Sequence, residues 1–281
     1  MKPVVPSMTL NPSPARPWWL WPNVLSLDAP LVALVWQEAW AMCLGVELAW
    51  IQRGVLALAV WLSYCGDRLL DARRLDGPVG SQRHEFARRH SVPLRKVWLG
   101  AAVGMVVLGL SLPWKEIAWG MVMLMGVGGY FMLQHWERTR GVVGAFKELM
   151  AGAVFAVGAV FFVMVQASFS WAFVMGVCAW VGLCAMNCMV IAYGDREVDA
   201  DMRQPSLVRY WAKAREWMWP WAMGVMGSAM GAWGLDERLA PLAGSILVGA
   251  LALGELARSG AGDGRRVLAD TVLLAPILFW L

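Results

Sequence analysis

The stretch WAFVMGVCAWVGLCAMNCMVIAYGDREVDA, residues 171 to 200, decides what kind of protein this chain forms. It carries no charged residue before Asp195, and as a helix such a run is long enough to cross a bilayer. It ends in GDREVDA (194–200), and another long apolar run ends in GDRLLDA (66–72), 128 residues earlier. The sequence therefore combines membrane-spanning helices with an acidic motif that recurs at helix ends.

The composition as a whole is that of an integral membrane protein. Of the 281 residues, 59% are hydrophobic and 16% are charged, which is too apolar for an ordinary soluble domain. We expect an all-α, multi-pass transmembrane bundle of about nine helices, because lipid-facing backbone must be hydrogen-bonded within a helix or a closed barrel. The apolar windows lie at 30–49, 53–70, 94–113, 116–135, 147–167, 170–194, 217–234, 238–257 and 267–281.

Two regions follow from this layout. Residues 1–29 form an N-terminal arm rich in proline and tryptophan, and residues 30–281 form a single transmembrane helical domain. The arm has five prolines up to Pro17 and no uninterrupted apolar segment, so we do not expect a cleaved signal peptide. Trp18, Trp19 and Trp21 are expected at the bilayer interface.

The basic residues are strongly divided between the two sides of the predicted bundle. The N-terminal arm and the loops after the second, fourth, sixth and eighth windows carry 21 of the 24 Lys and Arg residues. The other side has only Arg53, Lys115 and Arg238. The positive-inside rule therefore places the N-terminus and both acidic motifs on the cytoplasmic side of the cell (inner) membrane, at the mouth of an active site.

The acidic motifs have the spacing of paired ligands. On a helix, residues four apart lie on one face, so Asp67 pairs with Asp71 and Asp195 with Asp199. Two like charges this close repel each other, and a bound cation removes the repulsion. Oxygen ligands without neighbouring His or Cys favour a hard ion, and we expect Mg²⁺.

Many basic residues surround these carboxylates. They outnumber the four acids, which indicates a metal-bridged polyanion such as a diphosphate. The apolar bundle below is rich in Gly, Ala, Met and Trp and is suited to a hydrocarbon tail. We therefore expect an amphiphilic substrate, with its diphosphate at the cytoplasmic surface and its tail in the membrane. The basic residues are Arg68, Arg73, Arg74, Arg83, Arg88, Arg89, Lys147 and Arg196.

With these features the chain resembles the UbiA superfamily of intramembrane prenyltransferases. That family's first motif reads N-D-x-x-D-x-x-x-D, and here Asp67 and Asp71 match it while Ser63 and Tyr64 replace the leading Asn and Asp. The second motif, D-x-x-x-D after an aromatic residue, is complete in YGDREVD (193–199), and a lysine begins the window at 147. The resemblance covers nearly the whole chain in topology but only two short stretches in specific residues.

The resemblance implies particular roles. Asp67, Asp71, Asp195 and Asp199 would be the catalytic residues that hold Mg²⁺ and, through it, the diphosphate. Contacts to the diphosphate itself would come from Arg68, Lys147 and Arg196. Because the first motif lacks its leading pair, Asn187 is a candidate for a substitute amide ligand, although packing or hydrogen bonding between helices is an alternative role for it.

Two further features have open interpretations. Glu38 falls inside the first window, where an acid is a candidate for orienting an acceptor or taking its proton. The alternative is a buried Glu that pairs with another helix. Residues 82–90 form either an amphipathic lid over the mouth or a basic stretch that binds anionic lipid headgroups. His84 and His90 stand at no metal-ligand spacing, and we assign them no role.

The expected activity is Mg²⁺-dependent transfer of an isoprenyl group from a prenyl diphosphate to a lipophilic or aromatic acceptor. Alternatives are a membrane terpene cyclase of the UbiA type, a non-catalytic relative that binds prenyl lipids, and a cation-coupled transporter. Transporter sites favour broken helices and charges near mid-membrane, whereas these acids are at helix ends. Membrane lipids are expected neighbours; nothing in the sequence indicates a nucleic acid or an obligate protein partner.

Overall fold

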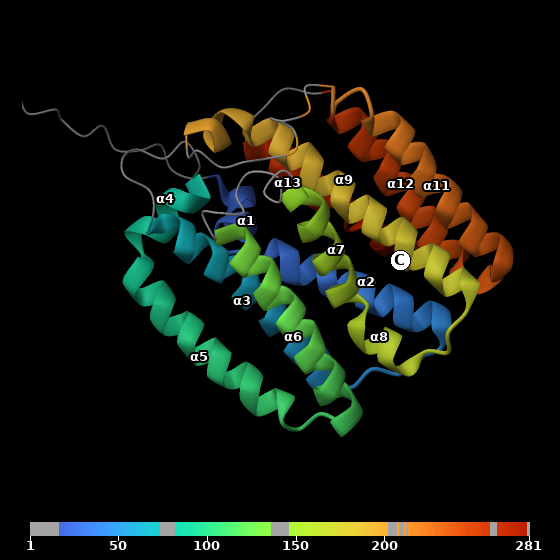
Figure 1. The fold of residues 1–281 in the computed structure, drawn as a ribbon, viewed down its shortest axis with the longest axis horizontal. Coiled ribbons are helices and arrows are strands. Elements are labelled where there is room, and N and C mark those ends of the chain that lie inside the picture. The colour runs from blue at the N-terminus through green and yellow to red at the C-terminus, as the bar shows by residue number, and fades with distance from the viewer. Residues whose placement is uncertain are drawn as a thin grey trace, which may run out of the picture.

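The computed structural model describes residues 17–73, 82–135, 146–201, 207, 211, 213–258 and 263–279. Regular structure within these ranges is entirely helical, which confirms the all-α class (Figure 1). In chain order the α-helices and short 3₁₀ helices (η) are η1 (Trp18–Leu20), α1 (Trp21–Val24), α2 (Asp28–Leu44), α3 (Trp50–Ala72), α4 (Gln82–Arg89), α5 (Ser91–Gly109), α6 (Trp114–His135), α7 (Lys147–Ala159), α8 (Phe161–Gln166), α9 (Trp171–Asp201), α11 (Met218–Leu235), η3 (Glu237–Leu239), α12 (Ala240–Leu256), α13 (Asp263–Val272) and η4 (Ala275–Phe279).

Each predicted apolar window holds helix, but two windows differ from the expectation of one continuous span. The window 147–167 is divided between α7 and α8, which meet at Val160. The window 267–281 holds the end of α13 and then η4 in its described part, so a single helix of bilayer length does not form there. Asp270 and Pro276 interrupt the apolar pattern of this window.

Four helical segments of the described chain are long and apolar enough to cross a membrane. The structure thus supports membrane association, while the number of crossings and the side of the N-terminus stay predictions. The four segments are Ser91–Gly109, Trp114–Leu133, Trp171–Gly194 and Glu237–Leu256.

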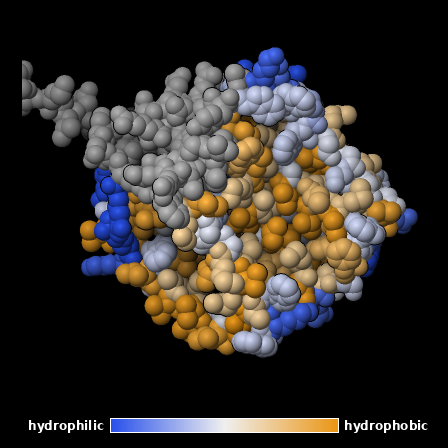
Figure 2. Space-filling view, in the orientation of Figure 1, coloured by the Kyte–Doolittle hydropathy of each residue, from blue (hydrophilic) through white to orange (hydrophobic). Residues whose placement is uncertain are grey.

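The surfaces of α5 and α6 indicate a lipid environment most directly. No residue of α5 is buried, and Val103, Val107 and Leu110 are each more than half exposed. Figure 2 shows hydrophobic side chains over much of the face in view, with hydrophilic residues mainly toward its edges. A soluble protein rarely exposes so much contiguous apolar surface, whereas contact with lipid tails satisfies it.

The interior is organised around α9, which contacts α7, α11, α12 and α13. The indole rings of Trp36 on α2 and Trp180 on α9 are fully buried and stack with their centroids 3.8 Å apart. Trp36 Nε1 donates to the carbonyl of Leu273 at 2.6 Å, and Trp180 Nε1 donates to the carbonyl of Ala156 at 3.1 Å. The stack therefore links α2, α7, α9 and the segment after α13.

Helix α7 approaches α9 at a glycine. A Cβ atom on Gly152 would lie 2.5 Å from the backbone nitrogen of Ala185, which is closer than any real contact. Only a residue without a side chain allows the two backbones to pack at this distance, as at many helix interfaces within membranes. This approach sets how closely the start of α7 lies against α9.

We expect Gly152→Ala to destabilise the folded protein by about 1–3 kcal/mol, because the new methyl group meets backbone that cannot rotate away. Gly104→Ala on α5 is the matched control, since a Cβ there meets nothing within 4 Å. Unfolding of both variants in detergent, followed by circular dichroism, measures the difference. Equal unfolding midpoints would show that the α7–α9 approach is not tight.

Candidate functional site

The first acidic motif forms the last turns of α3. Asp67 and Asp71 are both partly buried and lie on one side of the helix. The C-terminal end of a helix carries the negative pole of its dipole, so a carboxylate there is disfavoured by about 0.3–1 kcal/mol. The helix dipole therefore does not explain two acids at this position.

Arg68 lies between these two aspartates in sequence and is buried. Its Nη1 donates hydrogen bonds to the backbone carbonyls of Asn23 and, at 3.3 Å, of Val24. These carbonyls lie at the C-terminal end of α1, where the chain then turns through Ser26 with φ of 59°. Arg68 is thus fixed by protein contacts, and the predicted contact with a diphosphate would use its other nitrogens.

Helix α4 packs over the end of α3 and brings a histidine to the motif. His84 is 4% exposed, and its Nε2 lies 3.7 Å from Asp71 Oδ2. Phe86 of the same helix packs edge-on against Trp21 of α1. The segment 82–90 therefore covers this end of α3, as the lid interpretation requires, and His84 is a site residue that sequence spacing did not reveal.

The second acidic motif continues α9 as helix to Asp201. The side chains of residues 195–201 lie outside the described part, so the roles of Asp195, Arg196 and Asp199 stay predictions. Tyr193, just before the motif, has the guanidinium carbons of Arg265 and Arg215 at 5.4 and 5.6 Å from its ring centre. Basic residues from α13 and from the turn before α11 therefore surround the start of this motif.

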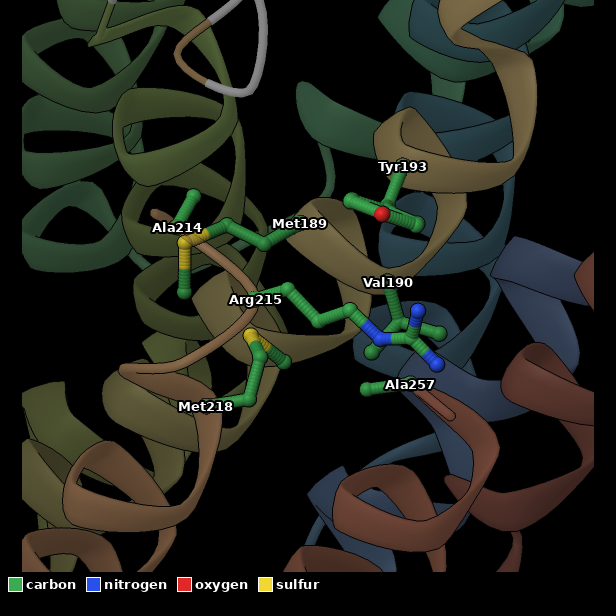
Figure 3. Close-up of a pocket in the computed structure, with 7 residues that line it drawn as sticks. All are labelled: Met189, Val190, Tyr193, Ala214, Arg215, Met218 and Ala257. Carbon is green, nitrogen blue, oxygen red and sulfur yellow. The ribbon is translucent and has the colours of Figure 1, made fainter. Parts of the chain in front are cut away.

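Figure 3 shows a hollow beside this tyrosine, with Arg215 reaching across it. Its walls are mostly apolar, and the space free inside is close to that of one water molecule. As it stands this hollow is too small to hold a prenyl chain. The residues that line it are Met189, Val190, Tyr193, Ala214, Arg215, Met218 and Ala257.

A group of polar side chains from α1, α2, α9 and α13 lies beside Arg68. Asn23 Nδ2 donates to Asp28 Oδ2 at 2.6 Å and lies 3.4 Å from Asp270 Oδ2. Asn187 Nδ2 donates to Asp270 Oδ1 at 3.1 Å. Asn187 thus has the hydrogen-bonding role between helices that was one of its two expected roles. Through Asn23, whose carbonyl binds Arg68, the group connects the first motif to α9.

Lys147 begins α7, and Figure 1 shows this end of α7 toward the same edge of the molecule as the C-terminal ends of α3 and α9. The neighbouring Glu148 is buried, and its Oε2 accepts a hydrogen bond from the backbone nitrogen of Leu207 at 3.2 Å. The predicted diphosphate contact of Lys147 is compatible with this position.

Glu38 lies away from these residues. Its carboxylate forms a two-point ion pair with Arg53 near the start of α3, with distances of 2.5 and 2.9 Å. Arg53 precedes Asp67 by fourteen residues, or about 21 Å along a helix. Glu38 therefore pairs with another helix, as the alternative expectation has it, but it is partly exposed rather than buried, and the structure does not bring it to the acidic motifs.

Within the described ranges, no three His, Cys, Asp or Glu side chains form a group that could hold a metal. This finding does not extend to the side chains of the second motif. Comparison with known protein families, with curated proteins and with solved structures gave no match.

The position of His84 predicts a pH-dependent attachment of α4. Burial lowers the pKa of His84 below its ordinary 6.5, although the facing Asp71 opposes this shift and Arg83 and Arg68 add to it. When α4 is detached, His84 takes up a proton from about pH 6.5 downward, so the attached state loses stability as the pH falls below that value.

We expect hydrogen exchange of residues 82–90, corrected for its intrinsic pH dependence, to increase between pH 7 and pH 5.5. His84→Asn should reduce this increase, and His90→Asn, which alters an exposed residue, should not. A pH response that is the same in the His84 variant would assign the effect to another group.

Proposed function

We propose that this chain is an intramembrane prenyltransferase of the UbiA type, which transfers an isoprenyl group from a prenyl diphosphate to a lipophilic or aromatic acceptor. The observation that carries the proposal is the pair Asp67 and Asp71. These acids lie on one side of the last turns of a long apolar helix, against the helix dipole and next to the buried Arg68. A metal-bridged diphosphate would compensate their charge.

The donor set fits Mg²⁺, which prefers carboxylate oxygens and commonly completes its shell with substrate phosphates. Asp67 and Asp71, together with Asp195 and Asp199, would hold the ion. When bound, it would neutralise negative charge on the departing diphosphate. Arg68, Lys147 and Arg196 would bind the diphosphate oxygens directly and hold the reacting carbon below them.

The reaction breaks the bond between the allylic carbon and the diphosphate oxygen, and the diphosphate leaves with the electron pair. The nucleophilic atom of the acceptor then bonds to the allylic cation and releases a proton. Tyr64, one turn before Arg68, packs edge-on against Phe155 at 6.1 Å, and Phe155 lies 6.3 Å from Trp180. These electron-rich rings lead from the motif into the bundle and are suited to shield a cation from water.

We expect Asp67→Ala and Asp195→Ala each to reduce Mg²⁺-dependent release of diphosphate from farnesyl diphosphate by about a hundredfold or more. The matched control is Asp236→Ala. Asp236 pairs with Arg238 just after the C-terminal end of α11, which is the end of that helix away from the motifs. Unchanged release in both motif variants would refute the proposal.

A panel of acceptors then separates transfer from cyclisation. Purified protein would receive geranyl, farnesyl and longer prenyl diphosphates, with hydroxybenzoates, naphthoates, porphyrin-like rings or glycerol lipids. A prenylated acceptor identifies a transferase, whereas hydrocarbon or alcohol products without any acceptor identify a terpene cyclase. In the same assay, Glu38→Gln tests the predicted acceptor-orienting role, which requires less transfer at unchanged diphosphate release.

A further inference from the structure

Two carboxyl groups from distant parts of the chain meet beside Arg68, and neither belongs to an acidic motif. Asp28 begins α2, Asp270 lies in α13, and their side chains are hydrogen-bonded to each other. Asn23 Nδ2 joins them from α1, at 2.6 Å from Asp28 Oδ2 and 3.4 Å from Asp270 Oδ2. Ionised carboxylates only accept hydrogen bonds, so a direct bond between the two requires a proton on one of them.

The surrounding donors decide which acid carries the proton. Asp28 Oδ1 accepts from the backbone N–H of Ala29 at 3.0 Å, and the positive pole at the start of α2 favours a carboxylate there. Asp270 Oδ1 accepts from Asn187 Nδ2 at 3.1 Å, which leaves Oδ2, on the side of Asn23 and Asp28, to hold the hydrogen. Asp270 is therefore the protonated member and donates to Asp28.

The charged groups near this pair act on it only at longer range. Among the described residues neither Asp28 nor Asp270 forms an ion pair. The η1, α1 and η4 segments carry no titratable side chain, and Glu255 of α12 pairs with Arg258. The side chains that interact electrostatically with the pair or with its neighbours are Tyr64, Asp67 and Arg68 of α3, Arg83 of α4, Lys147 and Glu148 of α7, Cys188 of α9 and Arg266 of α13.

This environment raises the pKa of Asp270 from 3.8 to about 7. Burial is the main cause and the facing Asp28 adds to it, whereas the hydrogen bond from Asn187 and the charge of Arg83 oppose it. Helix α13 is not one of the four described segments that are long and apolar enough to cross a membrane. Asp270 therefore changes its charge near neutral pH.

We propose that Asp28 and Asp270 share one proton and form a pH-sensitive latch between the start of α2 and α13. The carbonyls of Asn23 and Val24, just before α2, bind Arg68, so the closed latch also fixes the position of Arg68. Loss of the proton leaves two carboxylates in contact, and their repulsion separates α2 from α13. The latch depends only on these contacts, whereas its effect on diphosphate binding rests on the proposed function.

The latch responds to pH in the direction opposite to α4. A separated Asp270 has its ordinary pKa of 3.8, whereas the joined pair keeps its proton up to about pH 7. Between these values the joined state binds more protons, so it is most stable below pH 3.8 and weakens as the pH rises. Its equilibrium constant should fall by up to about tenfold per pH unit in this window.

Infrared spectroscopy of the full chain in detergent, without metal or prenyl diphosphate, tests the shared proton. We expect a C=O stretching band of a protonated carboxylic acid at pH 5.5 that shifts in D₂O and disappears by pH 8.5. Asp270→Asn should lack this band. Asp28→Asn should also lack it, because the remaining Asp270 then faces an amide and ionises. Asp236→Asn, which changes an acid after the C-terminal end of α11, should keep it.

Hydrogen exchange tests whether the latch opens. After correction for intrinsic pH dependence, exchange of residues 263–272 and 21–31 should increase by about tenfold or more between pH 5.5 and pH 8. Asp28→Asn should abolish this increase, because its amide donates to the Asp270 carboxylate throughout this range. Circular dichroism at each pH verifies that every variant is folded.

The regulatory consequence is measured with substrate. Because the closed latch holds Arg68 in place, the KM for farnesyl diphosphate should rise more steeply above pH 7 in the unaltered chain than in Asp28→Asn. Equal slopes would show that the latch does not regulate the diphosphate site.

Two results would overturn the latch itself: no protonated-carboxyl band that Asp270→Asn removes, or an equal pH response of exchange in the folded Asp28→Asn variant. Both measurements are made without substrate. Diphosphate release by the motif variants decides the proposed function, so the failure of one proposal is distinct from the failure of the other.

Discussion

The stack of Trp36 on Trp180 is the interaction on which the arrangement of the helices depends. Two indole N–H groups inside an apolar bundle are costly unless each has a partner, and here each donates to a carbonyl of another segment. Asp28 precedes Trp36 by two turns of α2, about 12 Å, and Asn187 follows Trp180 by two turns of α9, about 10 Å. Asp270 is three residues before the bonded Leu273. The stack therefore fixes the positions along α2, α9 and α13 at which these polar side chains meet.

The helix dipole acts in opposite directions on the acids that begin a helix and on those that end one. Asp28 begins α2, where the positive pole of the helix favours a carboxylate. Asp67 and Asp71 end α3, where the negative pole opposes them, and Asp71 faces His84 of α4. Arg68, between them in sequence, is bound to the carbonyls of α1.

Periodicity and hydropathy predicted the elements of the fold well, because a chain in lipid must satisfy its backbone within each helix. They did not predict the break at Val160, and the short α13 lies in a window whose apolar pattern Asp270 and Pro276 interrupt. For the site, spacing within one helix identified Asp67 with Asp71. It did not identify Asn23, Asp28, His84 and Asp270, which belong to different helices and share no local pattern. Tyr64 stands where the resembled motif has an acid, and it lies close enough to interact electrostatically with both Asp28 and Asp270.

The sequence by itself determined the all-helical class, the apolar helices and the pairing of acids at i and i+4, because each depends on residues near one another in the chain. Only the tertiary structure decided that Arg68 binds the end of α1, that α4 covers Asp71 with His84, and that Glu38 pairs with Arg53 away from the motifs. It also brought Asn23 and Asp270 together across 247 positions of the chain. Contacts of this kind depend on how whole helices pack, and in this chain buried indoles and the glycine that admits α7 against α9 determine that packing.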